Sequence, residues 1–358
     1  MRRRCNGVCR RFFSMENWIF QIRDIIDEAA GMKTLVLERR NGEPVPYQAG
    51  QFLTLLFSFR GHDLRRSYSF STAPGVDPVP AITVKRVANG EVSRHLLDHL
   101  RVGDALNTLP PAGRFTLSDW DGEDLVFIAA GSGVVPVFSL LKAARAARPG
   151  ARLRVLTQQH DEASSPFRGA MAEMELEWTE NLTVREGRLT KDRLEEWLRR
   201  AAVVGSGAYA FLCAPFDFMR MTQIVLRTLG VADERIRREH FTAGPVPPAP
   251  PVFDATPKKV LVRGPVDREF VVTWPESILT AAVRQGIPLP YSCRAGRCSS
   301  CVARCLNGRV RMTHNEVLTE KDLAEGLVLT CVGYAETDVE LGYARSSATN
   351  AMGSRDAD

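Results

Sequence analysis

Apolar and polar positions divide the chain into regions of different periodicity, and the first region is rich in short β-like runs. Residues 15–120 contain the runs Gln51–Phe59, Ser67–Ser71 and Ala81–Val87, which are separated by proline and glycine. Short strands at this spacing predict an antiparallel β-barrel or sandwich. One amphipathic helix is predicted at Val92–Leu100, where leucine and valine recur at helical spacing.

Residues 121–244 alternate between strand-like and helical patterns. Such alternation predicts an α/β domain whose parallel sheet is covered by helices on both faces. The stripe formed by Phe167, Met171, Met174 and Trp178 predicts the core side of one of these helices. The predicted strands are Asp124–Ala130, Arg152–Thr157, Leu182–Val184, Tyr209–Cys213 and Ile236–Phe241.

The chain then passes through a proline-rich segment into a small third region. Residues 245–256 predict an extended, semi-rigid linker, because proline favours a stiff backbone. Residues 257–345 contain two β-like runs, a helix near Glu276–Gln285 and a cysteine-rich loop. Residues 346–358 are predicted to be a disordered tail.

The formal net charge of +5 arises within the first 14 residues, where five arginines stand without an acidic residue. The 47 basic residues less these five leave 42, which equals the 42 acidic residues. We therefore predict a disordered arm at 1–14, with Met15 as an alternative start, and no nucleic-acid partner. No apolar run is long enough to cross a membrane, and no signal-peptide core is present. These features predict a cytoplasmic protein without a membrane partner.

Four cysteines provide the most specific chemical pattern. Cys293, Cys298 and Cys301 have the order Cys-x4-Cys-x2-Cys, and Cys331 follows at a distance. This is the ligand spacing of plant-type [2Fe–2S] ferredoxins. A structural zinc site usually has two Cys-x2-Cys pairs, and disulfide frameworks belong to small secreted domains. The spacing therefore predicts a one-electron carrier, and the rest of the chain must supply its electrons.

Three further segments have residue types that bind phosphates and planar rings. A glycine turn between a predicted strand and a helix can direct backbone N–H groups at a phosphate. An arginine beside an aromatic residue and a hydroxyl can bind a phosphate and cover a ring. Each segment alone is weak, because many βα turns contain glycine and an Arg-Tyr-Ser run is usually only a strand. The segments are Gly131, Ser132 and Gly133 in the turn, Arg66, Tyr68 and Ser69 in the strand, and Gly90, Val92 and Ser93 at the start of a helix.

Taken in this order, the segments resemble the ferredoxin–NADP reductase family followed by a plant-type ferredoxin. The resemblance is strongest to the reductase subunits of phenylacetyl-CoA epoxidase systems, through Tyr291–Cys301, 312–315 and Leu327–Cys331. It implies an FAD-binding antiparallel β-barrel at 15–120 and an NAD(P)-binding α/β domain at 121–244. It also implies that residues 257–345 form an α+β ferredoxin domain of the β-grasp type.

The same resemblance implies roles for individual residues. Ser69 would reach the central nitrogen of the flavin, Tyr68 would lie against its ring, and Cys213 would lie near the hydride path. Ala214 stands where the family usually has glycine. The implied cofactor-binding residues are Arg66, Tyr68, Ser69, Lys85, Gly90, Val92 and Ser93 for FAD, Gly131, Ser132, Gly133, Ala214 and Pro215 for the nicotinamide dinucleotide, and Cys293, Cys298, Cys301 and Cys331 for the cluster.

The resemblance leads us to expect a reductase that passes electrons from NADH or NADPH through FAD and a [2Fe–2S] cluster to a separate oxygenase. The expected acceptor belongs to a phenylacetyl-CoA degradation system. Asp161 and Glu162 favour NADH, because acids after the second strand bind ribose hydroxyls and repel a 2′-phosphate, whereas Arg168 or Arg188 would favour NADPH. The open alternatives are a steroid hydroxylase, a ring-hydroxylating oxygenase or a hybrid-cluster protein as acceptor. An iron–sulfur redox sensor is an alternative of a different class.

Overall fold

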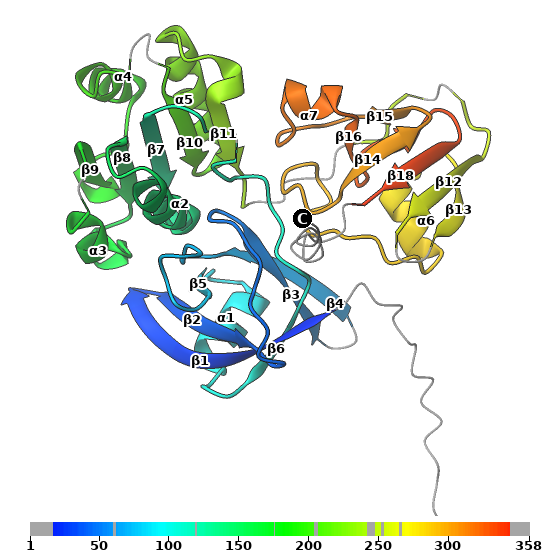
Figure 1. The fold of residues 1–358 in the computed structure, drawn as a ribbon, viewed down its shortest axis with the longest axis horizontal. Coiled ribbons are helices and arrows are strands. Elements are labelled where there is room, and N and C mark those ends of the chain that lie inside the picture. Colours follow the sequence, from blue (N-terminus) through cyan, green and yellow to red (C-terminus); the bar gives the residue numbers. More distant parts are fainter. Residues whose placement is uncertain are drawn as a thin grey trace, which may run out of the picture.

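The computed structural model contains three modules that pack around a common centre (Figure 1). Every helix in the described part of the chain is too short or too polar to cross a bilayer. The predictions for the arm at 1–14, for Met15 and for the tail at 346–358 fall outside the described residues, as do parts of the linker. The described residues are 17–59, 62–118, 120–174, 176–203, 207–241, 248–251, 254–264 and 267–343.

The first module is a six-stranded antiparallel sheet with the strand order β4-β3-β6-β1-β2-β5. An isolated bridge between Phe70 and Ile82 connects the two ends of this order, so the sheet closes into a barrel. Alternate residues of β1, namely Trp18, Phe20 and Ile22, point into its core. The predicted antiparallel barrel is confirmed. Its elements are β1 (Trp18–Ala29), β2 (Met32–Arg39), β3 (Phe52–Phe59), β4 (His62–Ser69), β5 (Ala81–Lys85), α1 (Glu91–Asp98) and β6 (Ala105–Thr108).

The second module is a five-stranded parallel sheet with the order β11-β10-β7-β8-β9. Successive residues of β7 face opposite cores, so Leu125 and Phe127 pack with α2 while Val126 and Ile128 pack with α4 and α5. Helices therefore cover both faces, as predicted (Figure 1). The elements are β7 (Asp124–Ala130), α2 (Val134–Ala147), β8 (Arg152–Gln159), α3 (Arg168–Ala172), β9 (Trp178–Thr183), α4 (Lys191–Arg200), β10 (Tyr209–Cys213), α5 (Phe216–Thr228) and β11 (Ile236–Glu239).

The helix predicted through the stripe Phe167, Met171, Met174 and Trp178 is wrong. Helix α3 covers only Arg168–Ala172, and Trp178 is the first residue of β9. Phe167 precedes the helix with a φ of 60°, a conformation that no residue inside a right-handed helix adopts. Phe167, Met171 and Met174 pack in one core, whereas Trp178 packs in the other. The helical spacing of the stripe therefore comes from two elements that face different layers.

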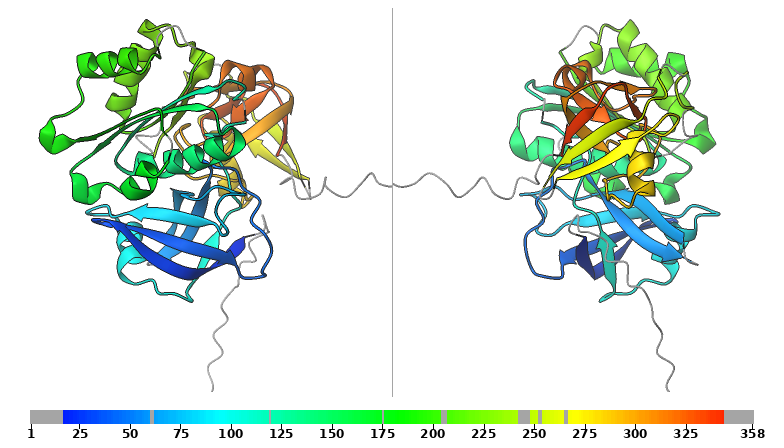
Figure 2. Two further views of the ribbon diagram at one scale, coloured as in Figure 1. Left: turned by 60° about the vertical axis from the view of Figure 1, so that its left-hand side comes forward. Right: turned by 90° about the vertical axis from the view of Figure 1, so that its right-hand side faces the viewer.

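The third module has the β-grasp arrangement that the family resemblance implies. Its sheet order is β13-β12-β18-β14-β16, with β12 and β18 parallel and the other pairs antiparallel. The module lies against the other two, as both views in Figure 2 show. The indole of Trp274 donates a hydrogen bond of 3.0 Å to the carbonyl of Pro250 in the linker. The elements are β12 (Lys258–Arg263), β13 (Arg268–Val272), α6 (Ile278–Arg284), β14 (Val302–Asn307), β15 (Val310–Met312), α7 (Glu320–Ala324), β16 (Leu327–Leu329), β17 (Gly333–Ala335) and β18 (Val339–Gly342).

The ends of β7 and β10 approach each other closely just before α2. A Cβ atom on Gly133 would stand 1.7 Å from the carbonyl oxygen of Cys213, which is an impossible contact. Glycine is therefore required at this position for the turn after β7 to pass beside the end of β10.

We expect Gly133→Ala to destabilise the protein, because the added methyl group meets backbone rather than a flexible side chain. Overpacking of this kind typically costs about 1–3 kcal/mol of the free energy of unfolding. Gly169→Ala is the matched control, since nothing lies within 4 Å of its Cβ position in α3, and it should stabilise by up to about 1 kcal/mol. Denaturant unfolding of both variants measures the contrast, and equal stabilities would contradict the close approach.

Candidate functional site

The strand order of the parallel sheet reverses at β7, and this is where such sheets bind ligands. Strands β8 and β10 flank β7, and Ala129 is paired with Cys213 near the carboxyl ends of the two strands. The residues predicted to bind the nicotinamide dinucleotide follow these strand ends directly. They are Gly131, Ser132 and Gly133, which form a 3-10 turn after β7, and Ala214 and Pro215, which follow Cys213 after β10.

The turn after β7 has the polarity that an anionic ligand requires. No side chain caps the N-terminus of α2, and its first turn contains no acidic residue. Gln159 donates a hydrogen bond of 2.9 Å to the carbonyl of Gly131 and fixes the turn. Lys85 of the barrel reaches this turn, because its Nζ lies 3.5 Å from the Cβ position of Gly131. An ammonium group beside free helical N–H groups fits a phosphate.

The predicted flavin residues lie on β4 and at the start of α1. Arg66 is exposed, and its guanidinium donates a hydrogen bond of 2.8 Å to the neighbouring carbonyl of Arg65. Burial raises the pKa of Tyr68 to about 12, so its phenol stays neutral. The Ser93 hydroxyl accepts from the Val87 N–H at 3.1 Å and donates to a carbonyl at 3.3 Å, so it shapes the turn before α1. An exposed guanidinium, a neutral aromatic ring and an uncapped helix start are suited to the phosphates and ring of FAD.

A buried glutamate, which no local sequence pattern reveals, connects the barrel to the parallel sheet. Ser69 donates a hydrogen bond of 3.4 Å to Oε2 of Glu239, and Glu239 is paired with Cys213 across β10 and β11. Burial raises the pKa of Glu239 to about 8, against the opposing effect of the Ser69 hydrogen bond. Burial, and then the charge of Glu239, raise the pKa of the Cys213 thiol well above its usual value. At neutral pH this group of side chains can hold a proton and contains no reactive thiolate.

The four predicted cluster ligands lie together as two pairs. Cys293 contacts Cys298, and Cys301 contacts Cys331. Among the described residues, no group of three or more histidine, cysteine, aspartate or glutamate side chains is arranged to hold a single metal ion. Two pairs are instead what a binuclear cluster requires, because each iron of a [2Fe–2S] centre takes two cysteines.

The backbone of the cysteine loop is turned toward the sulfurs. The N–H of Ala295 donates to Cys293 Sγ at 3.4 Å, and the N–H of Cys293 donates to Cys298 Sγ at the same distance. The Cys298 thiol and several loop N–H groups lower the pKa of Cys293 to about 6, whereas the neighbouring cysteines and burial raise the pKa of Cys298 and of Cys301. Gly296 has a φ of 71° and allows the turn that directs these groups inward. The donor set therefore fits the cluster.

Polar side chains join the ferredoxin module to the nucleotide module. Arg297, from the cysteine loop, lies 3.2 Å from Oε1 of Glu316, and His314 lies 2.7 Å from the same oxygen. Burial lowers the pKa of His240 to about 4, so its imidazole is neutral at pH 7. His240 Nε2 lies 3.0 Å from Glu316 Oε2, without the alignment of a hydrogen bond. A cavity of about 240 Å³ adjoins this contact and reaches Cys298.

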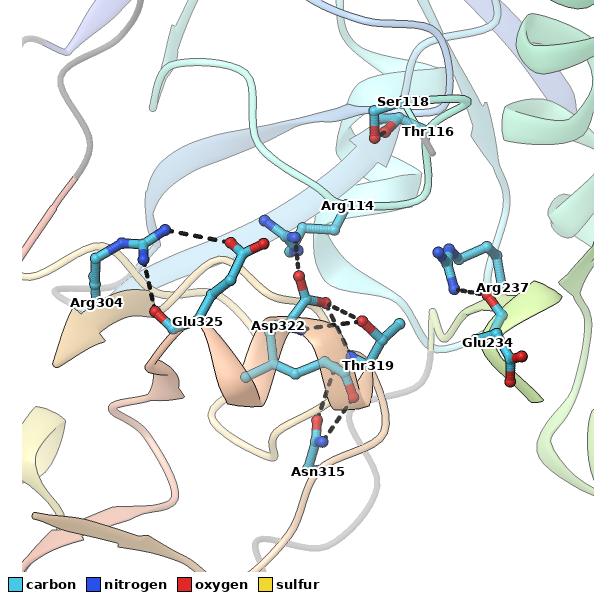
Figure 3. A network of polar contacts seen from close by, with 11 residues as sticks. Arg114, Thr116, Ser118, Glu234, Arg237, Arg304, Asn315, Thr319, Asp322 and Glu325 are labelled. Carbon is cyan, nitrogen blue, oxygen red and sulfur yellow. Dashed lines mark hydrogen bonds and ion pairs between the residues drawn. The ribbon is translucent and has the colours of Figure 1, made fainter. Parts of the chain in front are cut away.

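A second polar contact joins the ferredoxin module to the chain between β6 and β7. Arg114 points at the carboxylate of Asp322 in α7 and pairs with it (Figure 3). Asp322 also accepts hydrogen bonds from the N–H and hydroxyl of Thr319, and this capping box fixes its orientation. Neither partner stands out in the sequence, because each is an ordinary charged residue until the modules are brought together.

Comparisons with known proteins agree with this architecture. Residues 28–117 match the oxidoreductase FAD-binding domain family, and residues 262–336 match the 2Fe-2S iron-sulfur cluster binding domain family. The chain is 32% identical over 343 residues to the ferredoxin reductase component of 3-ketosteroid-9-alpha-monooxygenase from Mycobacterium tuberculosis, covering 90% of this chain and 95% of the relative. It is also 32% identical over 312 residues to one of the subunits of 1,2-phenylacetyl-CoA epoxidase from Escherichia coli, covering 81% of this chain and 86% of that relative.

Two solved structures share the fold. Phthalate dioxygenase reductase, a modular structure for electron transfer from pyridine nucleotides to [2Fe–2S], matches with a TM-score of 0.59 and 21% identity, over 92% of this chain and 98% of that one. An intact type IV self-sufficient cytochrome P450 monooxygenase matches with a TM-score of 0.71 and 21% identity over 91% of this chain. The chain spans 40% of that longer protein.

Fold and site together define a flavin- and iron–sulfur-containing electron-transfer reductase. The chain belongs to the family of ferredoxin reductase components of oxygenase systems. It is an NAD(P)H oxidoreductase that uses FAD and a [2Fe–2S] cluster, and its relatives serve oxygenases.

The wild-type protein should lose stability as the pH rises, because the buried Glu239 must then ionise. We expect Glu239→Gln to abolish this loss, since glutamine does not ionise. The pKa of Glu239 is raised to about 8 in the folded protein, from an ordinary value of 4.5. Its contribution to the free energy of unfolding is therefore complete below the ordinary pKa and is lost as the pH rises through the folded pKa. The melting temperature of the variant relative to wild type should rise from about pH 5 to about pH 9.

Glu91→Gln is the control for this experiment, since Glu91 is exposed on α1. Its melting temperature should track wild type across the same range. A constant difference between Glu239→Gln and wild type would contradict a protonated, buried carboxyl group at this position.

Proposed function

We propose that the chain accepts a hydride from NADH beside the switch point of the parallel sheet and delivers electrons singly to a separate oxygenase. When bound, FAD takes both electrons of the hydride and the [2Fe–2S] cluster forwards them one at a time. The observation that carries this proposal is that β4 contacts both other modules. Ser69 bonds to Glu239 of the parallel sheet, and Ser67 bonds to Ser292 beside the cysteine loop.

The proposed roles follow from the charge and burial of each residue. Arg66 and Lys85 neutralise the phosphates of FAD, together with the N–H groups that begin α1 at Val92 and Ser93. Tyr68 covers the flavin ring as a neutral phenol. Gly131, Ser132 and Gly133 bind the dinucleotide phosphates, and Ala214 and Pro215 border the nicotinamide.

Ser69 and Cys213 are the proposed catalytic residues, and Glu239 assists Ser69. When FAD is bound, the Ser69 hydroxyl would turn its proton toward the reacting edge of the flavin, and the protonated carboxyl of Glu239 would donate to the Ser69 oxygen in its place. Cys213 supports the nicotinamide as a neutral thiol, since burial disfavours its thiolate. Cys293 and Cys298 bind one iron, and Cys301 and Cys331 bind the other.

The proposal favours NADH because of the segment after β8. Asp161 follows this strand, where an acid accepts hydrogen bonds from the ribose hydroxyls. Asp161 is held in place as the cap of a 3-10 turn, accepting from the N–H of Ser164 at 3.0 Å. Arg168 pairs with Glu162 at 2.9 Å, which lowers its capacity to bind a 2′-phosphate.

We propose an oxygenase of phenylacetyl-CoA degradation as the acceptor. The relative from Escherichia coli that belongs to such a system supports this choice. A steroid hydroxylase is the second candidate, because the steroid monooxygenase reductase is equally identical over a longer alignment. Product formation by each oxygenase, reconstituted with the purified reductase and NADH, separates the two acceptors. The cytoplasmic location and the absence of nucleic-acid and membrane partners stay predictions.

We expect Cys298→Ala to abolish the cluster while leaving flavin reduction intact. The variant should lose the cluster absorbance and most cytochrome c reduction, yet keep NADH-dependent ferricyanide reduction. Cys305→Ala is the matched control, since Cys305 is a half-buried thiol of the same module outside the two pairs. Loss of both activities together would contradict separable electron steps, and weak turnover in wild type would favour the redox sensor.

We expect the initial rate with NADH to exceed the rate with NADPH at equal concentration. Asp161→Ala should narrow this preference, because the variant no longer repels a 2′-phosphate or binds the ribose hydroxyls. Glu186→Ala is a suitable control, since Glu186 also belongs to a capping box after a strand of the same sheet. A preference of wild type for NADPH would contradict the proposed role of Asp161.

A further inference from the structure

Strand β4 turns opposite faces toward different partners. Successive side chains of a strand point to opposite sides, so Arg66 and Tyr68 lie on one face while Arg65 and Ser67 lie on the other. The first face has two of the proposed flavin residues, whereas Ser69, at the end of the strand, shares the second face with Ser67. The second face meets the segment of the ferredoxin module that leads into the first cluster ligand.

Ser67 makes a direct hydrogen bond to that segment. Its hydroxyl lies 2.8 Å from the hydroxyl of Ser292, the residue immediately before Cys293. On its other side the Ser67 hydroxyl lies 3.0 Å from Oγ1 of Thr54 in β3. Thr54 is buried. The three hydroxyl groups therefore form a chain that begins at the buried Thr54 of β3 and ends beside a cluster ligand.

Arg65 makes a second contact with the same segment. Its guanidinium donates a hydrogen bond of 3.3 Å to the carbonyl of Tyr291 and lies 3.7 Å from the centroid of the Tyr291 ring. Arg294 of the loop also lies over this ring, at 4.4 Å. A cation–π contact with a hydrogen bond from the same guanidinium holds Tyr291 in both position and orientation.

Two polar contacts between the ferredoxin module and the rest of the protein lie farther along the ferredoxin sequence. Arg114 pairs with Asp322 in α7, and His240 contacts Glu316. Neither contact involves a neighbour of Cys293. Arg297, which precedes Cys298, lies 5.7 Å from the centroid of the Phe216 ring in α5, without a hydrogen bond between the two. The contact from β4 is hydrogen-bonded and acts on the segment directly attached to Cys293.

We propose that Arg65 and Ser67 are positioning residues for electron transfer from the flavin to the cluster. This inference rests on the proposed function, since it assumes FAD on the Arg66 and Tyr68 face of β4. Tyr68 is the chain neighbour of Ser67, and Cys293 is the chain neighbour of Ser292. The hydrogen bond between the two serines therefore connects the flavin face of β4 to a cluster ligand. In each transfer one electron leaves the reduced flavin and enters the oxidised cluster, and no bond of the protein forms or breaks.

The test uses the FAD- and cluster-loaded protein with the variants Ser67→Ala and Ser292→Ala. Stopped-flow absorbance after mixing with NADH resolves flavin reduction from cluster reduction. We expect unchanged flavin reduction and a cluster reduction step that is about tenfold slower, because displacements near 1 Å have effects of this order or larger on positioned reactions. The double variant should be no slower than either single variant, since one hydrogen bond is lost in all three.

Two controls separate positioning from general damage. Ser67→Thr keeps the hydroxyl and should restore the rate. Ser58→Ala removes an exposed hydroxyl from the neighbouring strand β3 and should leave the rate unchanged. Amide hydrogen exchange of residues 291–298 provides a readout that is independent of activity. It should be faster in Ser67→Ala than in wild type and unaffected in Ser58→Ala.

An unchanged cluster reduction rate in Ser67→Ala, whatever its hydrogen exchange, would overturn the positioning role and leave the proposed function standing. A Ser67→Thr variant as slow as Ser67→Ala would overturn it as well. Failure of the proposed function itself has a different signature, because the cluster of the wild-type protein would then stay oxidised after NADH is added.

Discussion

The arrangement of the whole chain depends on strand β4, which is paired along its length with β3 and has contacts to both other modules. On one face of a single extended strand, Ser67 meets the ferredoxin segment and Ser69 meets the parallel sheet. The strand fixes the spacing of these two contacts at two residues, or about 7 Å. The spacing between the contact with the parallel sheet and the contact with the ferredoxin module is therefore set by the backbone geometry of β4.

Two glutamates, one buried and one half-buried, show how the contacts between modules accommodate carboxyl groups. Burial raises the pKa of Glu239 to about 8, and its one hydrogen bond from Ser69 only partly opposes this, so Glu239 retains its proton at neutral pH. Glu316 lies beside Arg297 and His314, so its charge is compensated. In both places the modules meet through polar groups that would be solvated if the modules separated. Such contacts resemble those of transient interfaces more than those of a shared apolar core.

Sequence patterns predict those secondary-structure elements whose residues show a clear local periodicity or apolar run. Strands β7 and β10 have the predicted limits, because buried parallel strands are continuous apolar runs. Strands β1 and β2 are not among the predicted runs, since their charged residues obscure the alternation. The stripe from Phe167 to Trp178 misleads because two elements with different cores happen to share a helical spacing. Glu239 and the Ser67–Ser292 contact depend on residues far apart in sequence, so no local pattern could identify them.

The hydrogen bond from Trp274 to Pro250 has a consequence for how the ferredoxin module is tethered. It holds Pro250, near the end of the proline-rich segment, against the ferredoxin module, so we expect Pro250 to move together with that module. A rotation that exposed the cysteine loop to an acceptor would have its pivot no later in the chain than Pro250. The residues after Pro250 then add no length to the tether between the modules. A shorter tether raises the effective concentration of the ferredoxin module at β4.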